Sequence, residues 1–302
     1  MTPLVTDRDL DILAALERFP LTAFQLLTLS QTFPQPFTDE RRVRERLQVL
    51  VAAKRIRQFR YAIAGPGSPA YYLLSPEGYA LLRGPDALPP SKRAFSELSV
   101  SRQAHAFYLA EFLVHFIVQA RRQEHTLLEY EREHLCVLRN GEDAVHPDAG
   151  FQLRLKSGAY FRYYLEIDNS TERVRSTAAP DTWSRKLRLY ERYAATSVDR
   201  FRVLVVTTKS EDRLRHILHL SAQLLTNTQK CLVCGTFLPS FLSTTDALET
   251  PCFLDHHGRK VPLILPIRHP SGARQKNAHL PTADSSLSSY DDHLAVALTP
   301  SG

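Results

Sequence analysis

Apolar residues recur every three or four positions in three segments near the N-terminus, a spacing that predicts amphipathic helices. Thr6 and Thr22 can cap the first two helices, and the third starts after Thr38. The buried face of the third helix is expected at Val43, Leu47, Leu50 and Val51. The pattern therefore predicts two short helices followed by a longer one.

The segment after the third helix changes to the period of β-strands. A strand over Ile56–Ile63, a turn GPGSP and a second strand AYYLLS predict a hairpin, and SPEGYALL begins another helix. Short, short and long helices followed by a hairpin are typical of a winged helix-turn-helix. We therefore expect a winged-helix domain over residues 1–83.

The rest of the chain divides into a linker, a second domain and a tail. Residues 84–98, GPDALPPSKRAFSEL, are rich in proline and polar residues and predict a linker. Residues 99–267 predict a long helix at Ser101–Gln123, and then an α-β-β-β-α-β core with an added α-β unit. Residues 268–302 lack a hydrophobic period, so we expect a disordered tail. The fold class is α/β (α+β).

Acidic side chains gather at the end of one predicted strand of the second domain. Alternation over Tyr160–Asp168 places Glu166 and Asp168 on one face of that strand and its apolar residues on the other. If the preceding strand pairs with it as a hairpin, Asp148 returns to the neighbourhood of Glu166. On the following helix Lys186, Tyr190 and Tyr193 share a face, so Lys186 faces either these acids or a surface Glu.

This acid cluster favours a hard cation. Magnesium is bound through one or two carboxylates plus substrate phosphates, and manganese suits the same oxygen ligands. Asp148 and Glu166 are therefore the candidate metal ligands, with Mg or Mn as the cofactor if the domain is catalytically active. Glu111 and Glu172 could also contribute, although solvation is the simpler interpretation of both.

The charge distribution favours nucleic acid. The chain carries a net charge of +6, and its pI is about 9.2. Between residues 38 and 60, eight Lys or Arg oppose three acids, a local balance of +5. The arginine run could be a solvated surface with intrahelical ion pairs, but its place on a third helix favours double-stranded DNA. The candidate DNA-binding residues are Arg41, Arg42, Arg44, Arg46, Arg57 and Arg60.

The cysteines and the remaining motifs narrow the alternatives. Cys231, Cys234 and Cys252, with His256 or His257, could bind zinc, but a second cysteine pair is missing; we expect buried cysteines and no zinc. Four cysteines are too few for a disulfide framework, and no apolar run reaches membrane length. We therefore expect a cytoplasmic protein with no membrane partner.

Two resemblances follow from these residues. The pair Pro147-Asp148, the strand end Glu166-Ile167-Asp168 and the helix carrying Lys186 resemble the PD-(D/E)XK nuclease core. With the winged helix and the runs EIDNSTE and RKLRLYERY, residues 5 to about 265 resemble the replication-relaxation family of plasmids and mobile elements. The nuclease resemblance implies that Asp148 and Glu166 hold metal and that a lysine assists. The nuclease pattern expects that lysine where this chain has Asp168, so Lys186 would have to supply the role.

Three functions remain open. The protein is a DNA-binding replication or relaxation factor of a mobile element, a metal-dependent endonuclease using Asp148, Glu166, Asp168 and Lys186, or a winged-helix transcriptional regulator. Replication or mobilisation proteins are the expected protein partners, and the sequence does not set the oligomeric state.

Overall fold

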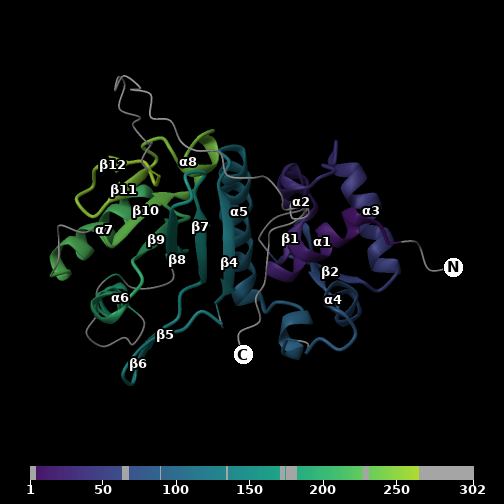
Figure 1. The fold of residues 1–302 in the computed structure, drawn as a ribbon, viewed down its shortest axis with the longest axis horizontal. Helices are drawn as coiled ribbons and strands as arrows, with labels where there is room; N and C mark the ends of the chain where they lie inside the picture. The colour runs from purple at the N-terminus through teal and green to yellow at the C-terminus, as the bar shows by residue number, and fades with distance from the viewer. Residues whose placement is uncertain are drawn as a thin grey trace, which may run out of the picture.

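The computed structural model of the protein describes residues 5–62, 68–88, 90–133, 135–170, 174, 182–226 and 231–264. These residues form a mixture of helices and sheets, which confirms the α+β class (Figure 1). The predicted tail over residues 268–302 lies outside the described residues.

The first unit has four α-helices and a three-stranded antiparallel sheet in its described residues. The helices are α1 (Asp7–Arg18), α2 (Ala23–Leu29), α3 (Glu40–Ala52) and α4 (Pro76–Arg83), with a 3-10 turn η1 at Ser30–Thr32. The strands are β1 (Leu21–Thr22), β2 (Ile56–Arg60) and β3 (Ala70–Leu74), in the order β1-β3-β2.

Side-chain caps fix where these helices start. The Thr22 hydroxyl accepts a hydrogen bond from the Gln25 N–H (3.1 Å), and the Gln25 side chain accepts one from the Thr22 N–H (2.9 Å). The Asp39 carboxylate accepts from the Arg42 N–H (3.0 Å), so α3 begins at Glu40. The helices then bury one core, which includes Ile12, Leu13, Leu26, Val43 and Leu47, all 0% exposed.

An ion pair between Arg46 and Asp9 ties α3 to α1. Two nitrogens of the Arg46 guanidinium donate to the two oxygens of Asp9. Asp9 is fully buried, and the Arg46 side chain is 25% exposed. Burial alone would raise the pKa of Asp9, but the hydrogen bonds from Arg46 and Thr6 hold that pKa below its usual value. Arg46 therefore holds α3 against α1.

The segment predicted as a linker packs against the first unit. It contains a short 3-10 helix, η2, at Lys92–Phe95, and Phe95 is buried with its ring 6.0 Å from that of Tyr79. Arg57 donates to the Phe95 carbonyl (2.9 Å), and the Leu98 N–H donates to the Tyr71 hydroxyl (3.0 Å). The division of the chain into two domains at residues 84–98 stays a prediction. The segment itself is anchored to the first unit by these contacts.

The second unit is a seven-stranded sheet covered by helices. Its sheet has the strand order β12-β11-β10-β9-β8-β7-β4. The strands are β4 (Thr126–Arg132), β7 (Ala149–Arg154), β8 (Tyr160–Asp168), β9 (Phe201–Thr207), β10 (Val233–Phe237), β11 (Phe253–Asp255) and β12 (Lys260–Val261). A separate hairpin consists of β5 (Leu138–Asn140) and β6 (Asp143–Val145). The helices are α5 (Val100–Arg122), α6 (Trp183–Thr196), α7 (Glu211–Leu224) and α8 (Leu238–Ser243).

Alternation along the central strand β8 separates the two covering layers. Tyr163, Leu165 and Ile167 face the core shared with α5 and α8, whereas Tyr164 faces the core of α6 and α7. Strands β8, β9 and β10 are parallel, with α6 and α7 as crossovers, while β7 and β4 are antiparallel to their neighbours. The predicted helix-and-strand order is thus present, with β5, β6, α8, β11 and β12 as additions.

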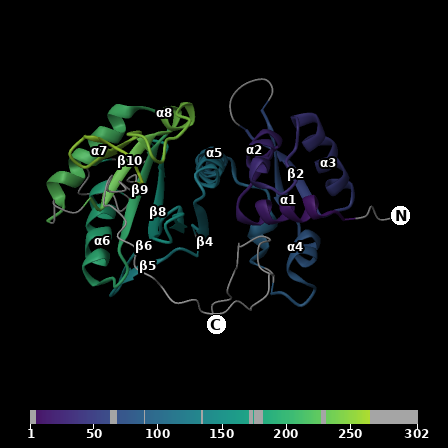
Figure 2. The ribbon, with the colours of Figure 1, turned by 45° about the horizontal axis from the view of Figure 1, so that its top comes forward.

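Helix α5 lies between the sheet and the first unit in both views (Figures 1 and 2). Gln25 of α2 donates to the Glu111 carboxylate (2.8 Å) and to the Phe107 carbonyl (3.4 Å) on α5. Glu111 therefore faces α2, away from the acids of the sheet. None of the helices in the described ranges is both long and apolar enough to cross a membrane.

Replacing Arg46 with Ala is expected to destabilise the protein by about 3 kcal/mol in denaturant unfolding. This is the lower end of the range for breaking a buried ion pair, because Arg46 keeps some exposure while Asp9 would be left buried and unpaired. The matched control is Arg44→Ala, which removes an exposed pair with Glu40 on the same helix and should cost less than about 1 kcal/mol. Equal losses in the two variants would contradict the structural role of Arg46.

Candidate functional site

The register of β7 and β8 brings two acids to the same place. Ala149 is paired with Leu165, and the Asp148 N–H donates to the Leu165 carbonyl (2.9 Å). Continuing this antiparallel register places Asp148 opposite Glu166. Glu166 belongs to the alternate set of β8 residues that faces α6, where Lys186 and Tyr190 lie.

Glu166 is buried between two donors from α6. The Lys186 ammonium donates to Glu166 Oε2 (2.9 Å) and the Tyr190 hydroxyl to Glu166 Oε1 (2.6 Å). Only 1% of Glu166 is exposed. Burial raises the pKa of Glu166 to about 7; Lys186 and Tyr190 oppose that rise, and the negative charge of Asp148 adds to it. The carboxylate of Glu166 is therefore stabilised by two side chains of α6.

Asp148 is bound by the backbone of β8 and by a side chain of α5. The Ile167 N–H donates to Asp148 Oδ2 (2.6 Å), and His105 Nε2 lies 3.2 Å from Asp148 Oδ1. Burial would lower the pKa of His105, but the hydrogen bond with Asp148 raises it above its usual value overall. His105 of α5 thus contacts a candidate site residue.

Asp168 is held by a separate set of partners. The Trp183 indole N–H donates to Asp168 Oδ2 (2.6 Å), and the Arg213 guanidinium donates to both oxygens (3.0 and 2.8 Å). The Ser170 N–H also donates to Oδ1 (2.8 Å). Asp168, which occupies the position of the lysine in the nuclease pattern, therefore forms an ion pair with Arg213. It is only 4% exposed.

This donor set does not present an open metal site. Two carboxylates satisfy the preference of Mg²⁺ for oxygen ligands, but every carboxylate oxygen of Asp148 and Glu166 already has a donor or cation beside it. Among the described residues no group of three or more His, Cys, Asp or Glu side chains could hold a metal ion. A metal at this site would have to displace Lys186 or Tyr190 from Glu166.

Sequence spacing identified part of this site. Strand alternation indicated Glu166 and Asp168, and the shared helix face indicated Lys186 with Tyr190. Trp183 lies one turn before Lys186 on the same helix and could have been included by the same spacing. Arg213 comes from the next helix, and no local pattern pairs it with Asp168.

The candidate DNA-binding arginines divide into two groups. Arg41, Arg42 and Arg44 are exposed on the first turns of α3. Arg41 and Arg42 pair with Glu45 (3.3 and 3.7 Å), and Arg44 pairs with Glu40 (2.7 Å). Exposed intrahelical pairs contribute only about 0.3–0.5 kcal/mol, so DNA phosphates could replace them. Arg46 belongs instead to the ion pair with buried Asp9.

The hairpin residues also differ from one another. Arg57 donates to the Phe95 carbonyl, whereas Arg60 lines a groove of about 500 Å³ with Arg44 and Gln48 of α3. The exposed ring of Phe24, at the start of α2, lies in the same groove. Residues 63–67, which include the end of the first predicted strand and the first three residues of the predicted turn GPGSP, lie outside the described residues.

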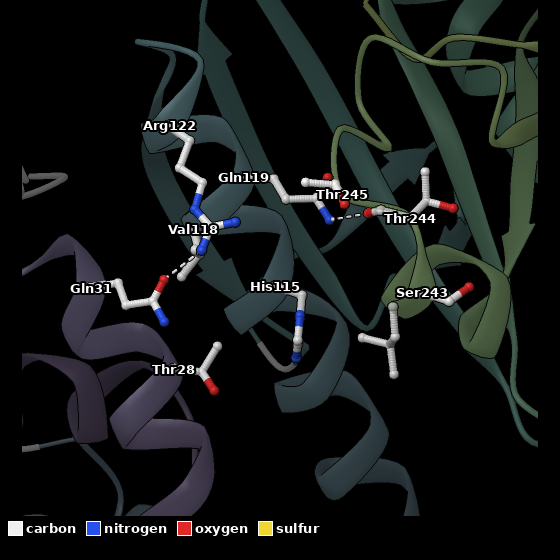
Figure 3. Close-up of a pocket in the computed structure, with 10 residues that line it drawn as sticks. Thr28, Gln31, His115, Val118, Gln119, Arg122, Ser243, Thr244 and Thr245 are labelled. Carbon is white, nitrogen blue, oxygen red and sulfur yellow. Dashed lines mark hydrogen bonds between the residues drawn. The ribbon is translucent and has the colours of Figure 1, made fainter. Parts of the chain in front are cut away.

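A second hollow, of about 320 Å³, lies where α2, α5 and α8 meet (Figure 3). Arg122 of α5 donates to Gln31 of the first unit (2.6 Å), and within the second unit Gln119 of α5 donates to the Thr244 carbonyl beside α8 (3.2 Å). Gln119 also accepts from the Ala247 N–H (2.8 Å). These contacts join α5 to both of its neighbours, which is a structural role.

A family described as replication-relaxation matches residues 14–203, more than half of the 302-residue chain. The chain belongs to the replication-relaxation family. Comparison with curated proteins and with solved structures gave no match. Membership supports a role in the replication or relaxation of plasmid or mobile-element DNA.

The matched part of this replication-relaxation protein contains most of the residues described above. It includes the arginines of α3, Asp148, Glu166 and the helix that carries Lys186. Arg213 and the Cys231–Cys234 segment lie beyond residue 203, where the match ends. The family resemblance expected from the sequence is therefore confirmed, while the roles of the individual residues stay predictions.

The pKa of Glu166 predicts a pH-dependent stability. Because the folded-state pKa is raised from 4.5 to about 7, the folded state retains a proton that the unfolded state loses between these values. This stabilisation is complete below about pH 4.5 and is lost as the pH rises through about 7. The free energy of unfolding of the wild type, measured in urea, should fall across this window relative to that of Glu166→Gln. Exposed Glu129→Gln is the control and should follow wild type; a wild-type profile parallel to that of Glu166→Gln would contradict the buried-acid assignment.

Proposed function

We propose that the first unit is a winged helix that binds double-stranded DNA, and that it positions the protein on plasmid or mobile-element DNA during replication or relaxation. The observation that carries this proposal is the cluster of exposed arginines at the start of α3. Helix α3 is the third helix of its unit and is followed by the β2–β3 hairpin. A recognition helix in that position presents its N-terminal turns to the major groove.

The surroundings of α3 support this assignment. Figures 1 and 2 place α3 on the side of the first unit away from the sheet, and the groove beside α3 extends to Phe107 and Glu111 of α5. Arg60 and Gln58 of the hairpin line the same groove as Arg44. Phosphate contacts from such arginines set affinity and register.

In this proposal the second unit is a scaffold and a surface for protein contacts. Glu166 faces α6, so the sheet and α5 separate it from α3 (Figure 1). Its oxygens bind Lys186 and Tyr190, and Asp168 binds Arg213 and Trp183. These closed contacts stabilise the packing of β8, α6 and α7. A replication or mobilisation protein is the partner that the family role implies.

A metal-dependent endonuclease is the second candidate function. The favouring observation is the ion pair of Lys186 with Glu166 beside Asp148, since a PD-(D/E)XK nuclease also needs a lysine next to its acids. Mg²⁺ or Mn²⁺ would supply Lewis-acid stabilisation of the phosphate.

A transcriptional regulator would use the same DNA-binding unit and would leave the Glu166 site without a role.

Loss of α3 arginines should weaken DNA binding in a mobility-shift titration. The double variant Arg42→Ala with Arg44→Ala should lose on the order of tenfold in affinity, and its salt dependence should become shallower by about 0.9 for each phosphate contact removed. Arg215→Ala is a matched control, because Arg215 is also exposed and paired with a Glu four residues away, but on α7. Unchanged binding by the double variant, or an equal loss in the control, would contradict the proposed interface.

A supercoiled-plasmid nicking assay separates the scaffold from the nuclease. With Mg²⁺ or Mn²⁺ present, the wild-type protein should bind the plasmid and leave it supercoiled. The nuclease is supported instead if wild type nicks the plasmid and both Asp148→Ala and Lys186→Ala abolish nicking while DNA binding persists. Nicking that survives in Asp148→Ala would indicate a contaminating enzyme.

A further inference from the structure

Two cysteines at the start of β10 differ sharply in their environments. Cys234 is 2% exposed in the centre of the sheet, where it pairs with Leu204 of β9 and Asp255 of β11. Cys231 precedes the strand and is partly exposed. Both are free thiols, and both side chains pack against the same hydrophobic core. The sequence predicted buried structural cysteines, which describes Cys234 but not Cys231.

Three neighbouring strands supply the surroundings of this pair. The Val203 N–H donates to the Leu232 carbonyl (2.8 Å), which fixes the segment between the cysteines against β9. Arg202 immediately precedes Val203, and His256 immediately follows Asp255, the partner of Cys234. Arg202 and His256 therefore lie beside the pair on the two flanking strands, and both lower the pKa of Cys231.

These neighbours give the two thiols opposite tendencies to ionise. The hydrogen bond from Cys234 lowers the pKa of Cys231 most strongly, and His256 and Arg202 add to the effect against partial burial, so that the pKa of Cys231 falls to about 6. The pKa of Cys234 rises, because Cys234 donates to Cys231 and is buried. The Cys231 sulfur also lies 3.3 Å from the Val233 carbonyl, to which its thiol donates.

We propose that Cys231 and Cys234 form an oxidisable dithiol, with Cys231 as the nucleophile and Cys234 as the resolving thiol, whose oxidant is a hydroperoxide such as hydrogen peroxide. The Cys231 thiolate attacks a peroxide oxygen, the O–O bond breaks, and the departing hydroxide takes up a proton to become water. This leaves a sulfenic acid on Cys231. Cys234 then attacks that sulfur, the S–S bond forms, and the hydroxyl leaves as a second water with the Cys234 proton. The two sulfurs lose two electrons and the peroxide gains them.

The other two cysteines serve as internal controls. Cys136 is 0% exposed, and burial raises the pKa of its thiol to about 12. The Cys252 sulfur lies 3.8 Å from the hydroxyls of Thr244 and Thr236. Neither has the combination of partial exposure, a thiol donor and a neighbouring cation that Cys231 has, so a protein thiolate should form first at Cys231.

Peptide mapping after peroxide treatment of the full-length protein tests the pairing. Chymotryptic cleavage after Phe237 or Phe241 separates Cys252 from the pair, so a disulfide within the Cys231–Cys234 peptide is diagnostic. We expect that peptide to lose two hydrogens and to resist alkylation, and a Cys234→Ala variant to retain a trappable sulfenic acid on Cys231. Equal oxidation of all four cysteines, or a disulfide that joins Cys231 to Cys252 or to a second chain, would overturn the proposal.

The pH dependence of alkylation gives a second measurement that needs no oxidant. The rate of iodoacetamide reaction at Cys231 should be half-maximal near pH 6, as the pKa of about 6 requires. In Cys234→Ala the midpoint should move toward the ordinary thiol value of about 8.5, and in Cys252→Ser it should stay unchanged. A wild-type midpoint near the ordinary value would show that Cys231 is not an activated thiol and would overturn the proposal by itself.

Discussion

A carboxylate in a protein interior needs cations or hydrogen-bond donors, and Glu166 is where this requirement shapes the second unit. Strand β8 is central in the sheet, so an acid on its α6 face cannot reach water. Helix α6 must therefore place Lys186 and Tyr190 over it. Removing one partner of such a buried pair typically costs about 3–5 kcal/mol. The same contacts fix the position of the helix against the sheet.

The layers built around this contact separate the two candidate sites. Asp148 links the end of the sheet to His105 of α5, and α5 in turn meets α2 through Gln25 and Glu111. The exposed arginines of α3 lie beyond that junction, on the far side of α5 from α6 (Figures 1 and 2). A division between the proposed DNA-binding end and the closed acidic site follows from this order of layers. It favours a replication-relaxation protein that holds DNA over one that cuts the DNA it holds.

Local patterns predicted much of this arrangement. Period-two alternation indicated that Glu166 and Asp168 share a face, and helical spacing put Lys186 and Tyr190 together. Partners that are distant in sequence could not be found in this way. Arg46 looks like any other arginine of α3, because its buried partner Asp9 lies on another helix. Likewise, Arg213 of α7 pairs with Asp168, and no local sequence pattern predicts this pair.

The hydrogen-bond donors that occupy the acids could not be predicted from the sequence either. Two carboxylates at the end of a strand resemble a metal site when only residue types and spacing are known. Whether they are open depends on donors supplied from elsewhere, such as the Ile167 N–H and the Tyr190 hydroxyl. These donors are set by tertiary packing, which explains why the fold could be anticipated further than the chemistry of the site.

Site-specific photo-crosslinking to duplex DNA tests the central claim most directly. A photoreactive amino acid replaces Gln48, which is exposed on α3, or Arg188, which is exposed on α6. The account predicts crosslinked DNA from position 48 and none from position 188. Crosslinking from position 188 alone would contradict it, because DNA would then lie over α6 and the Glu166 site instead of α3.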